Sequence, residues 1–207
     1  MLEEIEMYAK ERNVPIMLQD GIDYLCNYIL EHKIKNILEI GSAIGYSAIR
    51  MALVDNNIRV TTIEKDVDRY MVAVDNINKF NLGDRINIIL GDALDTVIDG
   101  KFDLIFIDAS KGNNINFFKK YSENLSDYGI IITDNLFFHG LVCDEELIKT
   151  KNQRGIVRKI KDFIKFLDEN QEFNTEYVSV GDGISISKRK WFYMGKGWFN
   201  ENIGCVW

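Results

Sequence analysis

Short apolar runs alternate along this chain with longer stretches in which apolar residues recur every three or four positions. A continuous apolar run of about five residues is typical of a buried parallel strand, and the longer spacing is typical of a helix that packs on a sheet. The predicted strands are 36–40, 59–64, 86–90, 102–108, 130–134, 175–180 and 184–187. The predicted helices are 19–31, 46–54, 68–80, 93–98, 115–124 and 156–170.

The order of these elements predicts the fold class. Strands and helices alternate from residue 36 onward, which is typical of parallel βαβ units. The last two strands are separated by Gly181, Asp182 and Gly183, a turn signal for an antiparallel hairpin. We therefore expect an α/β, doubly wound, Rossmann-like sheet that is mostly parallel, with one antiparallel strand in a C-terminal hairpin.

Composition favours one cytoplasmic domain. The chain has 207 residues, of which 46% are hydrophobic, enough for a single α/β core. It contains one proline and no linker-like segment, so no boundary is expected before about residue 187. The charged start has no signal peptide or membrane span, and three unpatterned cysteines fit a reduced cytoplasm. A formal charge of −7 argues against a generally sticky nucleic-acid binder, although a local basic patch is compatible with it.

The C-terminal end has a different composition from the rest. Residues 189–207 contain all three tryptophans, Trp191, Trp198 and Trp207. If exposed, this extension would form an apolar patch, so we expect it to pack on itself or on a second subunit of a homodimer. We therefore predict a domain at 1–188 and an aromatic-rich extension at 189–207, to which the sequence assigns no function.

The segment 36–48, NILEIGSAIGYSA, predicts a strand, a glycine-spaced loop and the start of a helix. Gly41 and Gly45 bracket the turn, where a missing Cβ lets the backbone reverse and lets a ligand approach. The dinucleotide pattern GxGxxG is absent because Ala43 occupies its middle position, which disfavours an NAD dehydrogenase. Glu39, just before the loop, suits a ligand that carries positive charge.

An acidic residue stands at or just after the end of every predicted parallel strand. Since ligands bind outside the carboxyl ends of such strands, these acids are expected at one edge. Any one of them could simply cap a helix, but five crowded carboxylates repel unless a cationic ligand or a metal lies among them. Glu64 also has the spacing at which a second-strand acid binds a ribose. The five acids are Glu39, Glu64, Asp92, Asp108 and Asp134.

Five motifs together resemble one protein family. They are ILEIGSAIGYSAI, TTIEKD, GDA, FDLIFIDASK and IIITDNLFFHG, within a match over roughly residues 5–188. The chain resembles the cation-dependent O-methyltransferases, which include catechol and caffeoyl-CoA methyltransferases and bacterial relatives. The resemblance implies a class I methyltransferase sheet and S-adenosylmethionine as the cofactor. The start of the chain leaves little room for the helix that, in that family, often precedes the segment VPIM, which here is residues 14–17.

The resemblance also implies roles for individual residues in cofactor binding. Glu39 and the loop from Gly41 to Gly45 would hold the methionine part, and Glu64 would hold the ribose. Asp92 and Ala93 would contact the adenine. The remaining implied cofactor contacts are Met17, Ser47 and Asp108.

The candidate metal ligands are Asp108, Asp134 and Asn135. All three offer hard oxygen atoms, and no histidine or cysteine stands among them, so Mg²⁺ or a similar divalent cation fits and zinc does not. The family places metal ligands at the same three positions. Lys111, in the segment DASK, matches the family's lysine beside the reacting oxygen. It would act as a general base or, if charged, stabilise the oxyanion, and the sequence leaves both roles open.

The substrate is predicted from two further features. Phe137 and Phe138 follow the metal motif and could stack on a phenol or a nucleobase, whereas His139 is read as a loop residue without a role. Arg154 and Arg158 begin a basic stripe, continued by lysines 161 and 165, that would meet a phosphate backbone or simply face solvent.

The segments DNLFFHGLV and NQRGIVRKIKDF most resemble the bacterial branch that methylates 5-hydroxyuridine at the tRNA wobble position to 5-methoxyuridine. The expected substrate is therefore tRNA. The alternative is a small-molecule catechol or hydroxycinnamoyl-CoA O-methyltransferase with the same core. A noncatalytic nucleotide-binding module would require the metal motif and Lys111 to be accidental.

Overall fold

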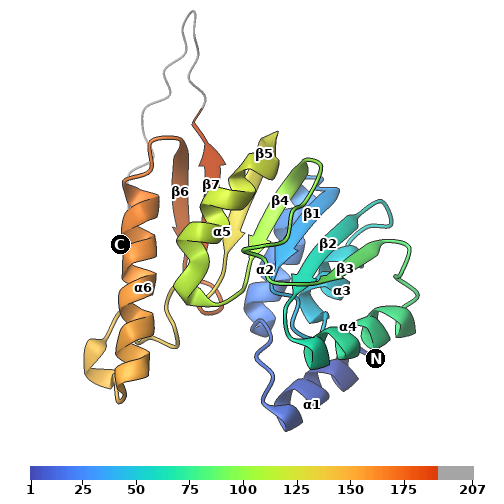
Figure 1. Ribbon diagram of the computed structural model, residues 1–207, viewed down its shortest axis with the longest axis horizontal. Helices are drawn as coiled ribbons and strands as arrows, with labels where there is room; N and C mark the ends of the chain where they lie inside the picture. Colours follow the sequence, from blue (N-terminus) through green and yellow to red (C-terminus); the bar gives the residue numbers. More distant parts are fainter. Residues whose placement is uncertain (191–207) are drawn as a thin grey trace, which may run out of the picture.

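The computed structural model describes residues 1–190, so most of the predicted extension, from residue 191 on, lies outside the described residues. Seven strands form one sheet in the order β3-β2-β1-β4-β5-β7-β6 (Figure 1). Strands β1 to β5 run parallel, and β7 is antiparallel to both of its neighbours. The predicted mostly parallel sheet with one reversed strand is therefore confirmed. The strands are β1 Asn36–Ile40, β2 Arg59–Glu64, β3 Ile86–Leu90, β4 Phe102–Ile107, β5 Leu125–Thr133, β6 Phe173–Val178 and β7 Ile184–Arg189.

Helices cover both faces of this sheet. Figure 1 shows α5 in front of the strands and α2 and α3 behind them. The α-helices are α1 Leu2–Arg12, α2 Gln19–Glu31, α3 Tyr46–Ala52, α4 Val67–Lys79, α5 Asn114–Tyr121 and α6 Lys151–Asp168. Three single turns of 3₁₀ helix connect them: η1 Lys111–Asn113, η2 Ser122–Asn124 and η3 Glu145–Leu147.

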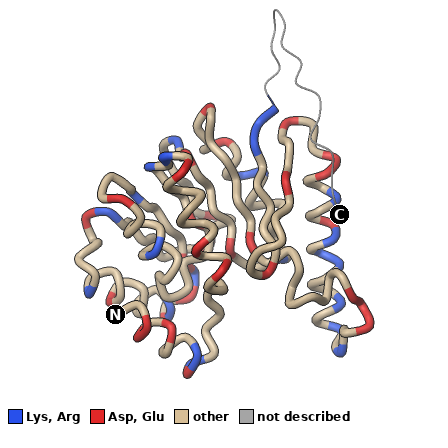
Figure 2. Tube along the Cα trace, turned by 180° about the vertical axis from the view of Figure 1, so that it is seen from behind, with Lys and Arg blue, Asp and Glu red and all other residues tan. Residues whose placement is uncertain are grey.

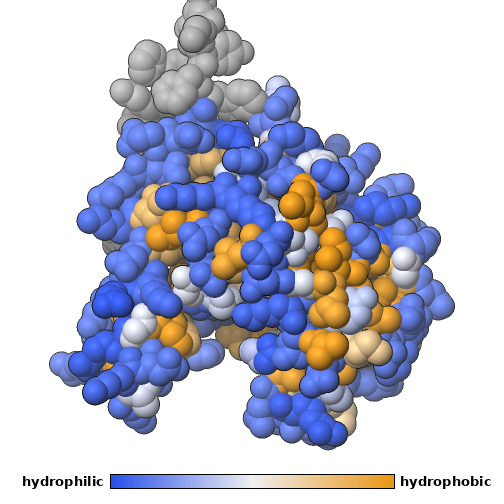
Figure 3. Space-filling view, viewed as in Figure 1, coloured by the Kyte–Doolittle hydropathy of each residue, from blue (hydrophilic) through white to orange (hydrophobic). Residues whose placement is uncertain are grey.

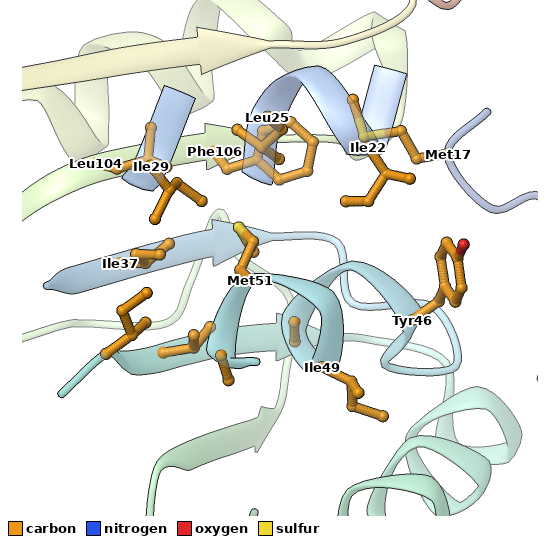
Figure 4. Close-up of a cluster of buried hydrophobic side chains, with 14 of the residues drawn as sticks. Met17, Ile22, Leu25, Ile29, Ile37, Tyr46, Ile49, Met51, Leu104 and Phe106 are labelled. Atoms are coloured by element: carbon orange, nitrogen blue, oxygen red, sulfur yellow. The ribbon is translucent and has the colours of Figure 1, made fainter. Parts of the chain in front are cut away.

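The core behind the sheet is built on α2. Ile22, Leu25 and Ile29 recur at helical spacing, are at most 1% exposed, and point toward side chains of β1 and β4 (Figure 4). Full burial of each such side chain stabilises the fold by about 2 kcal/mol, so truncation of Leu25 to alanine would cost about 2–5 kcal/mol. This packing fixes the start of α2, which directly follows a segment, residues 15–18, that forms one wall of the site described below.

The core in front of the sheet is aromatic and holds α6 in place. The ring of Phe118 in α5 lies edge-on to those of Phe163, Phe166 and Phe173, with centroid separations of 5.1 to 6.3 Å. At its start, α6 has a capping box in which Thr150 and Gln153 each bond the other's backbone N–H. The position of α6 against the sheet is therefore set by packing along one face, which leaves its basic residues on the surface.

Two sequence expectations are wrong. The stretch 93–98 forms turns instead of a helix, because the Asp92 side chain accepts the Leu94 N–H and the Asp92 carbonyl accepts the next two N–H groups. The start of the chain does have room for a helix: α1 spans eleven residues and buries Ile5 and Ala9 in the core behind the sheet. Among the described residues, no helix is long and apolar enough to cross a membrane.

Candidate active site

A cavity of about 420 Å³ opens at the carboxyl ends of β1, β2 and β4. One wall is the strap of residues 15–18 between α1 and α2, and the opposite wall is η1 with the loop after β5. Figure 3 shows this edge of the molecule hollowed between α1 and the lower end of α6. The cavity therefore lies where a doubly wound sheet is expected to bind its ligand.

Most of the predicted site residues meet in this cavity. Those that line it are Met17, Gly41, Ser47, Glu64, Asp92, Ala93, Asp108, Lys111, Asn135 and Phe138. The predicted residues outside its lining are Glu39, Gly45, Asp134, Phe137, Arg154 and Arg158. The members of the second group lie outside the lining for several different reasons.

Glu39 lies behind the cavity wall and is fully buried. One carboxylate oxygen accepts a hydrogen bond from the Ser47 hydroxyl and the other accepts one from the Thr62 hydroxyl, both at 2.5 Å. Burial raises the pKa of Glu39 to about 7, although these hydroxyls oppose the shift. Its carboxyl group joins β1, β2 and α3, so it holds the glycine loop in place from behind.

The two glycines of the loop allow close backbone packing. Gly41 has φ +99°, and a Cβ on it would lie 2.4 Å from the carbonyl oxygen of Asp108. Gly45 has φ +81°, caps the start of α3, and would bring a Cβ to 3.3 Å from that of Ala73. The loop is therefore pressed against the end of β4 and the middle of α4, which leaves its other side to the cavity.

Glu64, at the end of β2, organises the same loop from the side. Its Oε2 accepts the Ala43 N–H at 2.8 Å, and its Oε1 accepts the N–H groups of Lys65 and Asp66 at 3.0 and 2.9 Å. The carboxylate is 6% exposed and forms part of the cavity wall. Since each carboxylate oxygen has two lone pairs, a ligand hydroxyl can still donate to Oε2.

The acids after β4 and β5 form the most unusual part of the site. Asp134 is 2% exposed, and its Oδ2 accepts the side-chain N–H of Asn135 at 3.1 Å. Its Oδ1 is buried and has no hydrogen-bond partner among the described residues. Burial first, and then the charge of Asp108, raise the pKa of Asp134 to about 7. A buried acceptor left unpaired costs about 1–3 kcal/mol. Such acceptors are few in native proteins, and a ligand that binds the acceptor is one explanation for them.

Lys111 supplies the nearest positive charge. Its ammonium group lies 3.0 Å from Oδ1 of Asp108, and both side chains are only partly exposed. Within residues 1–190 no group of three or more His, Cys, Asp or Glu side chains is placed to hold a metal. The predicted set of Asp108, Asp134 and Asn135 contains two carboxylates and one amide, so its donors fit a hard cation that keeps several waters.

Asp182 is a site residue that the sequence reasoning did not single out. It lies in the turn between β6 and β7, is 6% exposed, and lines the cavity. Its Oδ1 accepts the N–H of His139 at 2.6 Å, and its carbonyl accepts the N–H of Phe137 at 2.7 Å. The loop that it holds contains three non-glycine residues in the left-handed region, Asn135, Phe138 and His139. The only sequence signal for this contact is the glycine-flanked turn.

Tyr46 is a second residue that was missed. It lines the cavity at the start of α3, and its hydroxyl donates to Glu6 of α1 at 2.7 Å. Arg50 donates to the same hydroxyl at 3.0 Å and forms an ion pair with Asp23 of α2. Helix α1, for which the sequence was expected to leave little room, is therefore hydrogen-bonded directly to a residue of the cavity wall.

The predicted substrate residues separate into two groups. Phe138 lines the cavity, as does His139, which was expected to have no role, whereas the ring of Phe137 packs beside Gly183 in the β6–β7 turn. Arg154 and Arg158 are exposed on α6, outside the cavity. Figure 2 shows basic positions gathered along this helix.

Comparison with known proteins identifies the family. The sequence model of the O-methyltransferase family matches residues 2–190. A caffeoyl-CoA O-methyltransferase of Populus kitakamiensis is 30% identical over 164 residues, which cover 75% of this chain and 70% of that protein. A Staphylococcus aureus structure, provisionally described as a caffeoyl-CoA O-methyltransferase, has 34% identity and a TM-score of 0.87 over 91% of this chain and 92% of that one. An O-methyltransferase from Bacillus cereus, solved with S-adenosylhomocysteine, has 28% identity and a TM-score of 0.77 over 91% and 90%. The chain therefore belongs to the O-methyltransferase family.

Proposed function

We propose that this protein transfers a methyl group from S-adenosylmethionine to a ring hydroxyl beside a second oxygen, with a divalent cation bound at Asp108, Asp134 and Asn135. We propose 5-hydroxyuridine at the wobble position of tRNA as the substrate. The observation that carries the chemistry is the buried, unpaired Oδ1 of Asp134 at the edge of a cavity already lined by Asp108.

The cavity suits a cofactor with a ribose at one end and a positive charge at the other. Glu64, at the end of β2, offers Oε2 to ribose hydroxyls, and Asp92 and Ala93 form the adjoining wall. Met17 lies in the strap that covers the opening from the other side. The Bacillus cereus relative was solved with S-adenosylhomocysteine, the product left when S-adenosylmethionine gives up its methyl group. This supports S-adenosylmethionine as the methyl donor here.

The donor set around Asp134 suits Mg²⁺ or a similar ion. When bound, such an ion supplies a positive charge that lowers the pKa of a substrate hydroxyl and offers open positions to two adjacent oxygens. Asp134 would contribute its unpaired Oδ1, and Asp108 would contribute a carboxylate oxygen. Asn135 holds Oδ2 of Asp134 by its amide, so the carboxylate is oriented before any ligand arrives.

Lys111 is placed to handle the proton or the charge of the reacting oxygen. Its ammonium is tethered to Asp108 at 3.0 Å at the cavity wall. As a neutral amine it would accept the proton of the substrate hydroxyl, and as an ammonium it would stabilise the oxyanion that attacks the methyl group. Attack of an oxyanion on a sulfonium neutralises both charges, so exclusion of water by the strap and by Phe138 favours it.

The tRNA substrate is supported by the oxygen pair of the base and by the surface beside the cavity. The 5-hydroxyl and the O4 carbonyl of 5-hydroxyuridine are adjacent oxygens of the kind that the cation would bind. Phe138 offers an aromatic face at the mouth for stacking of a flipped base. Arg154 and Arg158 add exposed positive charge on α6, which contacts η1 of the cavity wall.

A small phenolic substrate is the second candidate. Several relatives are named caffeoyl-CoA O-methyltransferases, and one from Vitis vinifera, 27% identical, is named a flavonoid 3′,5′-methyltransferase. A catechol ring also presents two adjacent oxygens, so the same cation site would serve it.

The deciding experiment measures transfer of a labelled methyl group. The enzyme is incubated with labelled S-adenosylmethionine and Mg²⁺, and with tRNA carrying 5-hydroxyuridine, caffeoyl-CoA or catechol as the acceptor. We expect label in the tRNA, mapped to the wobble nucleotide, and its loss on addition of a chelator. Faster turnover of a phenolic acceptor would establish the second candidate, and transfer that is insensitive to the chelator would remove the cation from the mechanism.

A further inference from the structure

The basic residues of α6 differ in whether they are already paired. Lys161 forms an ion pair with Glu145, and Lys165 forms one with Glu169 at 3.8 Å. Within residues 1–190 the four basic residues nearer the start of the helix form no ion pair: Lys151, Arg154, Arg158 and Lys159. The unpaired charges therefore gather at the end of α6 that begins beside the hollowed edge of the molecule (Figure 3).

Lys159 is distinguished from the other three by a close contact with η1. Its Nζ lies 2.7 Å from the point that a Cβ on Gly112 would occupy, and its Cδ and Cε lie 3.3 and 3.5 Å from the same point. The lysine therefore extends across the bare backbone of Gly112. Any larger residue at position 112 would displace the ammonium group.

The position of Gly112 puts that ammonium against a segment of the cavity wall. Gly112 stands between Lys111 and Asn113, and both of these line the cavity. Lys159 and Gly112 are both exposed, so a ligand can reach the ammonium from solvent. The nearest acid on the same helix face, Asp162, is one turn further along and forms no ion pair with it within the part of the chain that the structure describes.

An unpaired ammonium beside an active site is suited to binding a phosphate group. Lysine acts as a compact point charge that binds a phosphate oxygen without a fixed orientation. The methylated base of an RNA is joined through its ribose to phosphates, so a base inserted in the cavity places a phosphate at the rim. An isolated phenol offers no such group.

We propose that Lys159 binds a backbone phosphate of the RNA next to the methylated nucleotide and thereby positions that nucleotide for transfer. Arg158 and Arg154 continue the positive surface along α6 for the phosphates that follow. This inference rests on the proposed RNA substrate. It assigns Lys159 a role in positioning and none in the chemical step, because its contact is with Gly112 at the rim and not with the predicted cation ligands.

The test compares Lys159→Ala with a matched variant, Lys165→Ala, which removes a paired lysine further along the same helix. Each is assayed on an RNA stem-loop that carries 5-hydroxyuridine and on the free nucleoside 5-hydroxyuridine. For Lys159→Ala we expect KM for the stem-loop to rise about tenfold, with kcat for both acceptors and KM for the nucleoside unchanged. The slope of log KM against log salt should also fall by about one, as for the loss of one phosphate contact. Lys165→Ala should match the wild type throughout.

A second variant disturbs the contact between Lys159 and Gly112 by changing the glycine. In Gly112→Ala the new methyl group displaces only the flexible end of Lys159, so the protein should fold normally and show the same rise in KM for the stem-loop. An unchanged KM and salt slope in Lys159→Ala, with the wild type active on the stem-loop, would overturn the role of Lys159 alone. Inactivity of the wild type on any RNA would instead overturn the proposed function. Weakened binding of caffeoyl-CoA but not of catechol by Lys159→Ala would assign the phosphate to coenzyme A and overturn the RNA proposal.

Discussion

Glu39 and Asp134 are buried carboxylates near the ends of β1 and β5, and they have opposite surroundings. Burial raises the pKa of each to about 7. Both oxygens of Glu39 accept a hydroxyl hydrogen bond, whereas Oδ1 of Asp134 accepts none from the described residues. A raised pKa alone therefore does not separate a structural acid from a functional one, but an unsatisfied oxygen beside a second acid does.

The same comparison separates the two parts of the site. The cofactor side is held together by its own hydrogen bonds, from Glu39 to Ser47 and from Glu64 to the glycine loop. On the cation side, the Asp108 side chain is hydrogen-bonded only to Lys111 within residues 1–190, and Asp134 keeps one oxygen unpaired there. The fold thus completes the first half by itself, and in the proposed function a cation would complete the second half.

The largest expected effect comes from removal of the Asp134 carboxylate, whose Oδ1 is unpaired. Asp134→Ala should lower kcat for methyl transfer by roughly a thousandfold, because a cation that stabilises developing charge contributes several kcal/mol to the transition state. The rate is measured with labelled S-adenosylmethionine at saturating Mg²⁺. Binding of S-adenosylhomocysteine by the same variant serves as the control and should be nearly unchanged. Retention of activity would mean that Asp134 is structural, like Glu39.

A smaller effect is expected for the lysine that faces the same acids. Lys111→Ala should lower kcat by about a hundredfold, the usual contribution of a general acid or base. Lys111→Arg then separates its two candidate roles. Arginine keeps the positive charge but cannot accept a proton, so recovered activity would favour oxyanion stabilisation and continued loss would favour general-base catalysis. Wild-type rates in Lys111→Ala would exclude both roles.

The smallest effect on catalysis is expected at Glu39, where the change should appear in stability. Its folded pKa of about 7 exceeds the ordinary value of 4.5, so between these pH values the folded state keeps a proton that the unfolded state has lost. The free energy of unfolding should therefore fall as pH rises from about 4.5 to 7, by on the order of 3 kcal/mol, and then level off. Glu39→Gln should remove the part of this dependence that Glu39 causes, leave the part that Asp134 causes through its own raised pKa, and change kcat by only a few fold. Denaturant titrations across that pH range give the slope, and an equal slope in both proteins would show that Glu39 does not cause it.

The sequence predicted the sheet well because most of its strands are short, nearly continuous apolar runs. Segment 19–31 was assigned as a helix with the bounds that α2 has, since its apolar stripe is regular. Segment α1 was missed because most of its residues are charged, and only Ile5 and Ala9 reach the core. The false helix at 93–98 arose from apolar residues whose backbone is instead held in a turn by Asp92.

For the site, the sequence predicted which acids lie at the carboxyl ends of the strands but not the direction in which their side chains point. Glu39 was expected at the cofactor, yet its side chain lies behind the wall while the next residue, Ile40, lines the cavity. The contact between Asp182 and His139 joins residues 43 positions apart, so no local pattern indicates it. Lys159 was absent from the predicted basic stripe because its importance depends on Gly112 of another element.

The most direct test of the central claim is a calorimetric titration of Mn²⁺ or Mg²⁺ into the protein saturated with S-adenosylhomocysteine. Wild type, Asp134→Ala and Glu39→Gln are compared at the same pH. The account predicts one divalent ion bound per chain in the wild type and in Glu39→Gln, and none in Asp134→Ala. Equal binding by the wild type and Asp134→Ala, or no binding by the wild type, would contradict it.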